Sequence, residues 1–204
     1  LALSCNIAYA ELSQILGGEL LKEYADRFGL TSGFSVNGIK TAAGYFEAAA
    51  DGTAGLSWSG IGQYTDLVNP CAMLRLMEAI ANNGKAVTPR IIGKATTSGG
   101  FPIGLWLPES ERLMSKETAT ALSDMMRYNV TSVYGEKNFP GLEICAKTGT
   151  AQVGDGKKPH AWFVGFLRNE DYPYAFVVLV ENGGSGRTVA GGVASKVLQA
   201  AAGN

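Results

Sequence analysis

The sequence predicts an α+β fold in which helices are layered on an antiparallel sheet. Apolar residues recur at helical spacing through much of residues 1–130, and glycines close several of these patterns. Residues 142–182 then hold three β-rich runs joined by short turn-like links, which favours antiparallel neighbours. A last helical pattern at residues 188–202 completes the layers.

Two helices are predicted at the N-terminus. The first covers residues 6–18 and stops at two consecutive glycines, and the second covers residues 18–29 and ends at Gly29. The second helix carries one apolar stripe, which consists of Leu20, Leu21, Tyr24 and Phe28. From residue 30 to residue 64 the pattern dissolves into a loop rich in Gly, Ser, Thr and Asn.

Two more helices are predicted in the middle of the chain. Asn69 is the N-cap of the first and Pro70 its first residue, and Gly84 ends it. Ser115 caps the second helix. Their expected apolar positions are Met73, Leu76, Met77 and Ile80 in the first and Leu122, Met125, Met126 and Val130 in the second. Residues 88–100 between them read as a short strand or hairpin.

The β-rich runs are residues 142–151, 160–168 and 172–182. Because the third is apolar at every position of Ala175–Val180, we expect both of its faces to be covered. The last helix offers three valines to the sheet, and two glycines allow a close approach. These residues are Val189, Val193 and Val197, with Gly191 and Gly192.

Composition predicts one globular domain over residues 1–204. Hydrophobic residues make up 46% and charged residues 17% of the chain. The net charge of −1, without a Lys/Arg-rich run, gives no nucleic-acid footprint. The sequence has three cysteines, one histidine and no metal-binding spacing, so we expect neither a metal nor another cofactor. We interpret the cysteines as small, buried apolar side chains.

Two kinds of catalytic site fit the sequence poorly. Residues 141–148 almost match a phosphate-binding loop, but Ala146 stands in place of the second glycine and no helix follows. A Ser-His-Asp hydrolase would depend on His160, and the sequence has no G-x-S-x-G elbow. Because His160 opens a strand, a structural or turn-capping role is the better interpretation.

The predicted strand over residues 142–151 contains a lysine and a glycine, Lys147 and Gly149, although both residue types are disfavoured inside strands. Lys147 is followed by Thr148, Gly149 and Thr150 on this strand, while Ser4 and Asn6 stand just before a predicted helix. S-x-N opening a helix and K-T-G on a strand, in this order, are signatures of penicillin-binding proteins and class A β-lactamases. The structural alternatives are that Ser4 and Asn6 cap the helix N-terminus and that Lys147 is a charged residue on an edge strand that discourages pairing with other strands.

The rest of the chain resembles the transpeptidase domain of class B, high-molecular-weight penicillin-binding proteins. Residues 59–92 resemble the family's GQ loop and the helix after it, and the three β-rich runs resemble its closing strands. Two small departures are Tyr64, where the family usually has glycine, and Asn69, where it usually has threonine.

The resemblance implies a β-lactamase/transpeptidase-like fold and a role for each motif residue. Ser4 would relay a proton towards the leaving group, Asn6 would orient the substrate, and Lys147 would supply positive potential beside the scissile bond. Thr148 and Thr150 would bind the substrate carboxylate, and the Thr150 N–H would be one oxyanion donor. Gly149 would let a peptide lie along the strand edge.

The acylated serine of the family lies in S-x-x-K, and no lysine of this sequence has a serine three residues before it. We therefore expect the chain to be the C-terminal portion of the domain, from S-x-N to the last helix, with the N-terminal part of the fold missing. It would be inactive alone.

The implied function is a serine-type peptidoglycan D,D-transpeptidase. Its ligands would be D-Ala-D-Ala stem peptides and β-lactams, and a cell-wall synthesis complex would be its partner. It would act at the extracytoplasmic face of the bacterial membrane, with an anchor outside these residues. A D,D-carboxypeptidase or β-lactamase of the same fold, and a non-catalytic peptide-binding scaffold, remain alternatives.

Overall fold

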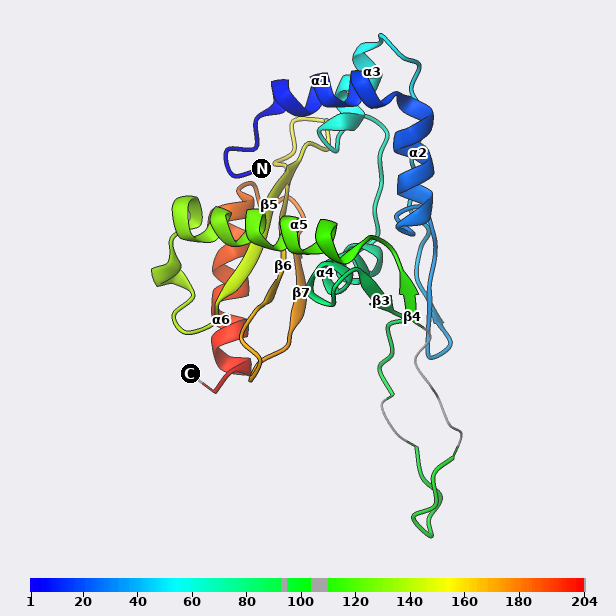
Figure 1. Cartoon of the computed structure of the whole chain (residues 1–204), viewed down its shortest axis with the longest axis vertical. Coiled ribbons are helices and arrows are strands. Elements are labelled where there is room, and N and C mark those ends of the chain that lie inside the picture. The colour runs from blue at the N-terminus through cyan, green and yellow to red at the C-terminus, as the bar shows by residue number, and fades with distance from the viewer. Residues whose placement is uncertain (93–94, 104–109, 204) are drawn as a thin grey trace.

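The computed structural model describes residues 1–92, 95–103 and 110–203. Its centre is a three-stranded antiparallel sheet (Figure 1), which consists of β5 (Ile144–Ala151), β6 (His160–Leu167) and β7 (Ala175–Val180). β6 lies in the middle, with Lys147 opposite Val164 on one side and Phe163 opposite Val178 on the other. The predicted α+β class and the three antiparallel strands are confirmed.

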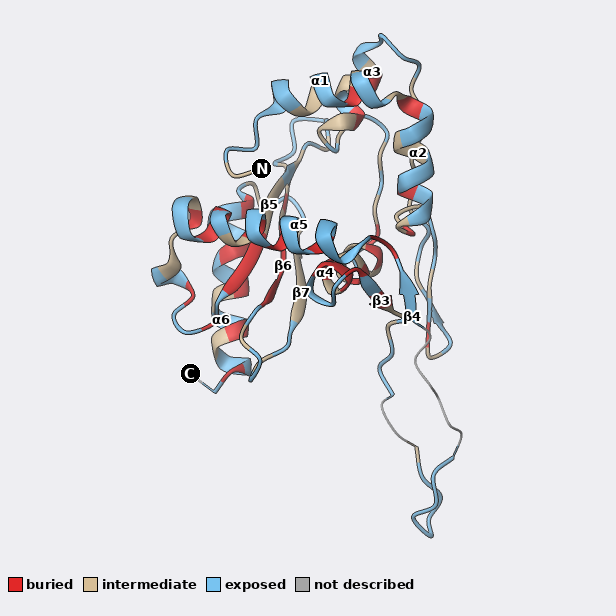
Figure 2. Ribbon diagram, in the orientation of Figure 1, coloured by how far each residue is buried: buried red, intermediate tan, exposed pale blue. Residues whose placement is uncertain are grey.

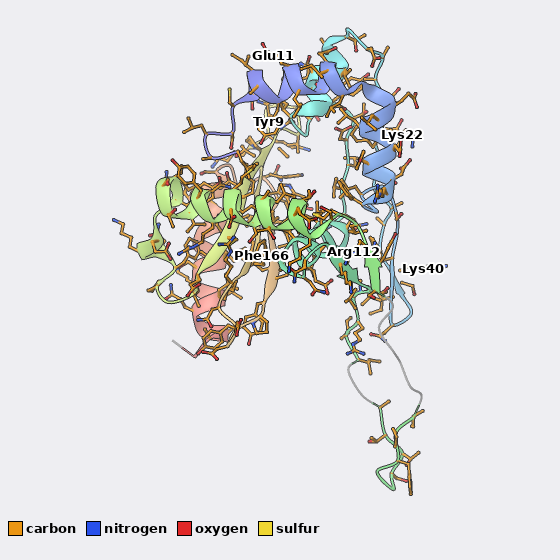
Figure 3. The ribbon with its side chains drawn as sticks, in the orientation of Figure 1. Tyr9, Glu11, Lys22, Lys40, Arg112 and Phe166 are labelled. Carbon is orange, nitrogen blue, oxygen red and sulfur yellow. The ribbon has the colours of Figure 1, made fainter. Side chains whose placement is uncertain are left out.

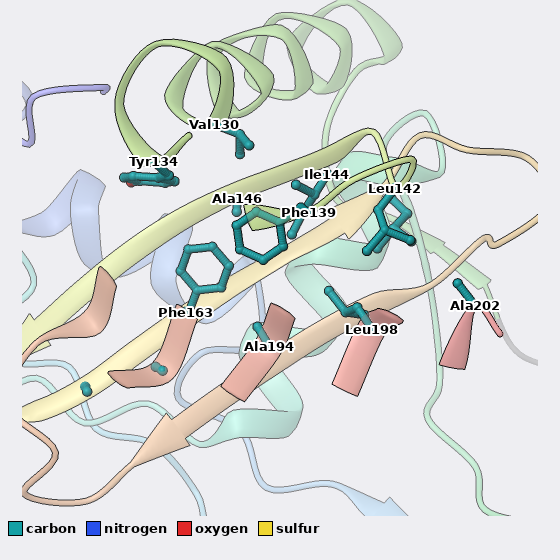
Figure 4. Packing of buried hydrophobic residues seen from close by; sticks show 13 residues of the cluster. Val130, Tyr134, Phe139, Leu142, Ile144, Ala146, Phe163, Ala194, Leu198 and Ala202 are labelled. Carbon is teal, nitrogen blue, oxygen red and sulfur yellow. The ribbon is translucent and has the colours of Figure 1, made fainter. Parts of the chain in front are cut away.

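Helices cover both faces of the sheet, and a separate core lies on each. On one face, α4 (Pro70–Ala81) and α5 (Lys116–Asn129) pack over Cys145, Val164 and Phe166 (Figure 3). On the other face, Phe163 is the centre of an apolar cluster (Figure 4) beneath the π-helical turn η1 (Val130–Tyr134) and helix α6 (Gly191–Ala201). Figure 2 shows buried residues concentrated in these layers.

Sequence signals placed α4 and α5 correctly. The side chain of Asn69 accepts the N–H of Ala72 at 2.9 Å, and Pro70 is the first residue of α4. The Ser115 hydroxyl accepts the N–H of Thr118 at 3.1 Å and caps α5. Side-chain acceptors at these positions satisfy N–H groups that the first turn of a helix leaves unpaired.

The predicted loop over residues 30–64 contains regular structure. The strands β1 (Ser35–Val36) and β2 (Ile39–Lys40) form a small hairpin, and α3 (Ala54–Gly60) is a short helix capped by Thr53. α3 lies against α1 (Asn6–Leu16), where the Gln14 amide donates to Ser57 Oγ at 2.8 Å. The loop prediction was wrong for α3 because its seven residues are too few to show a helical period.

The strands β3 (Lys85–Val87) and β4 (Ser110–Arg112) pair beside α4. The hairpin predicted over residues 88–100 falls partly on residues 93 and 94, which lie outside the described residues. In the described part, residues 95–103 make one antiparallel bridge, between Thr96 and Pro102.

Burial differs from expectation at the last helix. Val189, Val193 and Val197 are exposed, and the buried stripe is Ala190, Ala194 and Leu198, one position further along. η3 (Gly186–Ala190) and α6 form this segment, and a Cβ on Gly191 would contact the Phe163 ring at 3.6 Å, whereas Gly192 faces open space. Small residues rather than valines therefore face the sheet.

Burial also differs from expectation at the chain's start and at β7. Ile7 and Ile15 of α1 are 73% and 80% exposed, and on α2 (Gly18–Arg27) the predicted stripe is only half-buried at best. All residues of Ala175–Val180 are half-buried. Phe176, Val178 and Val180 pack against the core cluster around Phe163, and Ala175 and Val177 pack against the cluster under α4 and α5. Both faces of β7 are therefore covered as predicted, but only in part. Cys145 is buried as predicted, but Cys71 is half-buried and Cys5 exposed, which contradicts the reading for Cys5.

Candidate active site

The outer edge of β5 is the central feature of the site. Backbone groups of alternate residues in an antiparallel strand point away from the partner strand. On β5 these are the groups of Thr148 and Thr150, because the Thr148 N–H is bonded to the Tyr134 hydroxyl at 3.1 Å and the Thr150 carbonyl to the Gln63 amide at 3.1 Å. The motif residues therefore surround a strand edge that no other described strand covers.

Lys147 and Ser4 come together at this edge, although 143 positions separate them. Lys147 Nζ donates to Ser4 Oγ at 2.7 Å and to the Thr148 carbonyl at 2.7 Å. Burial lowers the pKa of the Lys147 ammonium, because a low-dielectric environment disfavours its charge. An ammonium that gives up its proton more readily and contacts a hydroxyl is suited to proton relay.

The segment around Ser4 does not serve as a side-chain cap for α1. Ser4 has a φ of +47°, in the left-handed region that non-glycine residues seldom adopt. Cys5 occupies the N-cap position and makes no side-chain cap, while Asn6 is the exposed first residue of α1. The geometry therefore does not support a capping pair, and it turns the Ser4 hydroxyl towards Lys147.

Thr148 and Thr150 lie on the sheet face opposite to that of Lys147, as the alternation of a strand requires. The Thr148 hydroxyl is 3.2 Å from the Tyr134 hydroxyl, and Thr150 is exposed. The Lys147 amine reaches around to the outer edge, since it contacts the Thr148 carbonyl there. The site thus wraps around the edge of β5, with the amine and both threonines within one short segment of the strand.

Gly149 stands opposite Trp162 of β6. A Cβ at this position would lie 3.1 Å from the Trp162 Cβ, closer than most side chains tolerate. The packing of the neighbouring strand therefore favours glycine here, in addition to any peptide at the edge.

The loop after α3 borders the site through Gln63, a residue that the sequence assigned only to the GQ-loop resemblance. Tyr64 has a φ of +67°, which explains why the family usually has glycine at this position. Burial raises the pKa of Asp66 in the same loop to about 6, although a hydrogen bond from Ser59 at 3.0 Å partly opposes the shift. Tyr134 was also missed, and no pattern in the sequence marks it.

His160 has the structural role that its position predicts. It is the first residue of β6, and its Nδ1 accepts the N–H of Asn182, just beyond the end of β7, at 3.0 Å. In the described part of the chain, no group of three or more His, Cys, Asp or Glu residues could hold a metal ion.

A family model described as the penicillin-binding protein transpeptidase domain matches residues 1–199. The chain belongs to this family. It is 32% identical over 195 residues to the peptidoglycan D,D-transpeptidase PbpA of Mycolicibacterium smegmatis, covering 94% of this chain and 40% of that protein. It is 29% identical to PbpA of Mycobacterium tuberculosis, covering 93% of this chain and 39% of that protein.

Solved structures of penicillin-binding protein A from M. tuberculosis have the same fold. Its ceftriaxone acyl-enzyme complex matches with a TM-score of 0.87 at 29% identity, over 97% of this chain and 46% of the solved one. Its penicillin G acyl-enzyme complex matches with a TM-score of 0.86 at 29% identity, over 98% of this chain and 47% of the solved one. The chain spans about 40% of the length of the curated relatives quoted above. Among its described residues, no helix is long and apolar enough to cross a membrane.

Proposed function

We propose that this transpeptidase domain acts in a serine-type peptidoglycan D,D-transpeptidase, which acylates itself with a D-Ala-D-Ala stem peptide and passes the acyl group to an amine. The observation that carries the proposal is the contact of Lys147 Nζ with Ser4 Oγ at 2.7 Å, beside an open strand edge. The names of the relatives as D,D-transpeptidases support it.

Each residue has a distinct part in the proposed reaction. Because Ser4 Oγ accepts from Lys147, its own proton is available to the departing D-Ala amine, and the ammonium can replace that proton. The half-buried charge of Lys147 and the hydroxyls of Thr148 and Thr150 would hold the terminal carboxylate. The N–H of Thr150 points to the outer edge, where it can stabilise the oxyanion. Asn6 would orient the peptide from the start of α1.

The attacking serine would come from an S-x-x-K segment, which these 204 residues do not contain. The whole enzyme would work in cell-wall synthesis at the outer face of the cytoplasmic membrane, together with other cell-wall proteins. β-Lactams would acylate the same serine, as the acyl-enzyme complexes of penicillin-binding protein A support.

The test uses the full-length protein that carries this chain, a peptide ending in D-Ala-D-Ala and an amine acceptor. We expect mass spectrometry to detect release of D-Ala together with the cross-linked peptide. Hydrolysis without cross-linking would identify a carboxypeptidase, and rapid hydrolysis of penicillin a β-lactamase. If the peptide binds and neither reaction occurs, the protein is a peptide-binding scaffold.

A further inference from the structure

The Tyr134 hydroxyl lies beside the carboxylate-binding motif and makes two contacts with one residue. It accepts the backbone N–H of Thr148 at 3.1 Å and lies 3.2 Å from the Thr148 hydroxyl oxygen. The contact with the N–H is on the outer edge of β5, where a bound peptide or β-lactam would lie, and the contact with the hydroxyl is beside it on the sheet face that Tyr134 covers. Tyr134 is therefore in direct contact with the site, although it belongs to the turn after α5.

The number of hydroxyl protons limits how Tyr134 and Thr148 can share their hydrogen bond. A tyrosine hydroxyl has one proton to donate, and the Thr148 N–H occupies one of its acceptor positions. If the tyrosine proton goes to Thr148 Oγ1, the threonine's own proton is free to point away from it. A carboxylate accepts hydrogen bonds only, so a free threonine proton is what the subsite needs.

The tyrosine is held rigidly enough to impose this direction. It is 4% exposed, and its ring packs edge-on against Phe163 with 5.8 Å between the centroids. Its carbonyl accepts from the Asn138 amide at 2.8 Å. The π-helical turn Val130–Tyr134 that carries it departs from the geometry of α5, and such turns recur at functional sites.

We propose that Tyr134 is a positioning residue of the carboxylate subsite, which donates its hydroxyl proton to Thr148 Oγ1 and so directs the Thr148 hydroxyl towards the ligand's carboxylate. This inference rests on the proposed function, because it assumes that Thr148 binds that carboxylate. Tyr134 touches no reacting atom and acts through Thr148 alone.

The experiment compares Tyr134→Phe with the unchanged full-length protein. Acylation by benzylpenicillin and by its methyl ester is followed in stopped flow, which separates the dissociation constant from the acylation rate constant. We expect the dissociation constant of benzylpenicillin to rise roughly tenfold while its acylation rate constant stays within about twofold, because the carboxylate is bound equally in ground and transition states. The methyl ester lacks the carboxylate, so its constants should not change.

Two controls sharpen the result. Tyr128→Phe removes a hydroxyl from an exposed tyrosine of the same helix–turn segment and should change neither constant. In a Thr148→Val background, Tyr134→Phe should no longer weaken benzylpenicillin more than its methyl ester, since the hydroxyl that Tyr134 directs is gone and any effect of the lost contact with the Thr148 N–H falls on both ligands alike. The proposal would be overturned if Tyr134→Phe weakened the binding of both ligands equally or of neither. It would also be overturned if Tyr134→Phe weakened benzylpenicillin binding as much in the Thr148→Val background as in the unchanged protein.

The same experiment distinguishes failure of the Tyr134 inference from failure of the proposed function. If the unchanged protein is acylated and Tyr134→Phe shows none of the expected differences, the inference fails and the transpeptidase proposal stands. If the unchanged protein is not acylated by either ligand, the proposed function fails, and the inference fails with it.

Discussion

Single side chains at the border of the site hold distant segments together, and Asn69 is the clearest case. Its Oδ1 caps α4, while its Nδ2 donates to the carbonyls of Ser32 at 2.8 Å and Ala42 at 2.9 Å. The residue is buried. The threonine that the family usually has could cap the helix but offers only one hydroxyl proton to these two carbonyls.

We therefore predict that Asn69→Thr lowers the free energy of unfolding by about 0.5–1.5 kcal/mol, because a single hydroxyl proton can keep at most one of the two part-buried hydrogen bonds. Asn69→Asp should be worse, since it keeps the cap and places an anion against both carbonyls. Chemical denaturation of the full-length protein checks both. A threonine variant as stable as the unchanged protein would show that the loop over residues 30–42 repairs the loss.

The titration of Asp66 gives a second prediction at this scale. Its pKa is raised from 3.8 to about 6, chiefly by burial, so the folded state binds its proton more tightly than the unfolded state. Between pH 4 and pH 6 the folded protein thus holds more protons, and stability falls as pH rises through this window. Asp66→Asn should flatten that fall, because an amide does not titrate there.

Melting temperatures at pH 4, 5, 6 and 7 test this prediction. The amide oxygen that Asp66→Asn introduces can still accept from Ser59, so the two proteins should melt at similar temperatures at pH 4. At pH 7 the variant should melt at the higher temperature, because it buries no charge. A gap that does not vary with pH would contradict the titration argument.

At the scale of elements, side chains occupy much of the outer edge of β5. Arg127 donates to the Ile144 carbonyl at 3.0 Å, and the Asn129 amide to the Ala146 carbonyl at 2.8 Å. Unpaired strand edges attract other strands, so this cover limits where a peptide can pair. Tyr134 occupies the Thr148 N–H and Gln63 the Thr150 carbonyl, and the Thr150 N–H between them remains for a ligand.

Gln63 occupies the Thr150 carbonyl, which a peptide lying along the edge would use as an acceptor. We predict that Gln63→Ala tightens the binding of a D-Ala-D-Ala peptide about two- to tenfold, the effect of removing one competing hydrogen bond. Titration calorimetry on the full-length protein measures this constant. Thr65→Ala in the same loop is the control, because Thr65 contacts Glu47 instead. Weaker binding by the Gln63→Ala variant would contradict the prediction, because it would show that the Gln63 amide binds the peptide instead of competing with it.

The elements with strong local signals could be predicted from the sequence, and those that depend on distant contacts could not. The Asn69–Pro70 cap and the strand alternation after residue 142 are local patterns, and both were found. The buried stripe of α6 was misassigned because Val193 and Ala194 lie on adjacent faces, and only the position of the Phe163 ring decides which one fits. Gln63 could not be placed, because its partner is 87 residues away.

Within the candidate site, short motifs named residues that are far apart in the sequence, but the contacts among them could not be predicted. Ser4 and Lys147 were named from short patterns, and the structure brings them into contact. Tyr134 has no local signature, since its position depends on a π-helical turn that follows α5. Cys5 was misread because cysteine is usually buried, whereas here it occupies an exposed helix N-cap.

On the scale of the whole molecule, the described chain exposes apolar surface on two sides. Leu3, Ile7 and Ile15 are exposed at the start, and β7 is a half-buried apolar strand with an unpaired edge among the described strands. We predict that the isolated 204-residue chain associates through these surfaces. Sedimentation velocity and thermal melting are the measurements. A monodisperse monomer with one sharp melting transition would contradict the prediction.

The most direct test of the active-site assignment is the rate at which a fluorescent penicillin acylates the full-length protein when Lys147 or His160 is replaced by alanine. Lys147 contacts Ser4 at the strand edge, whereas His160 accepts the backbone N–H of Asn182, just beyond the end of β7. We predict that Lys147→Ala slows acylation at least about a hundredfold and that His160→Ala leaves the rate within about threefold. A His160→Ala variant slower than Lys147→Ala would contradict this account of the site.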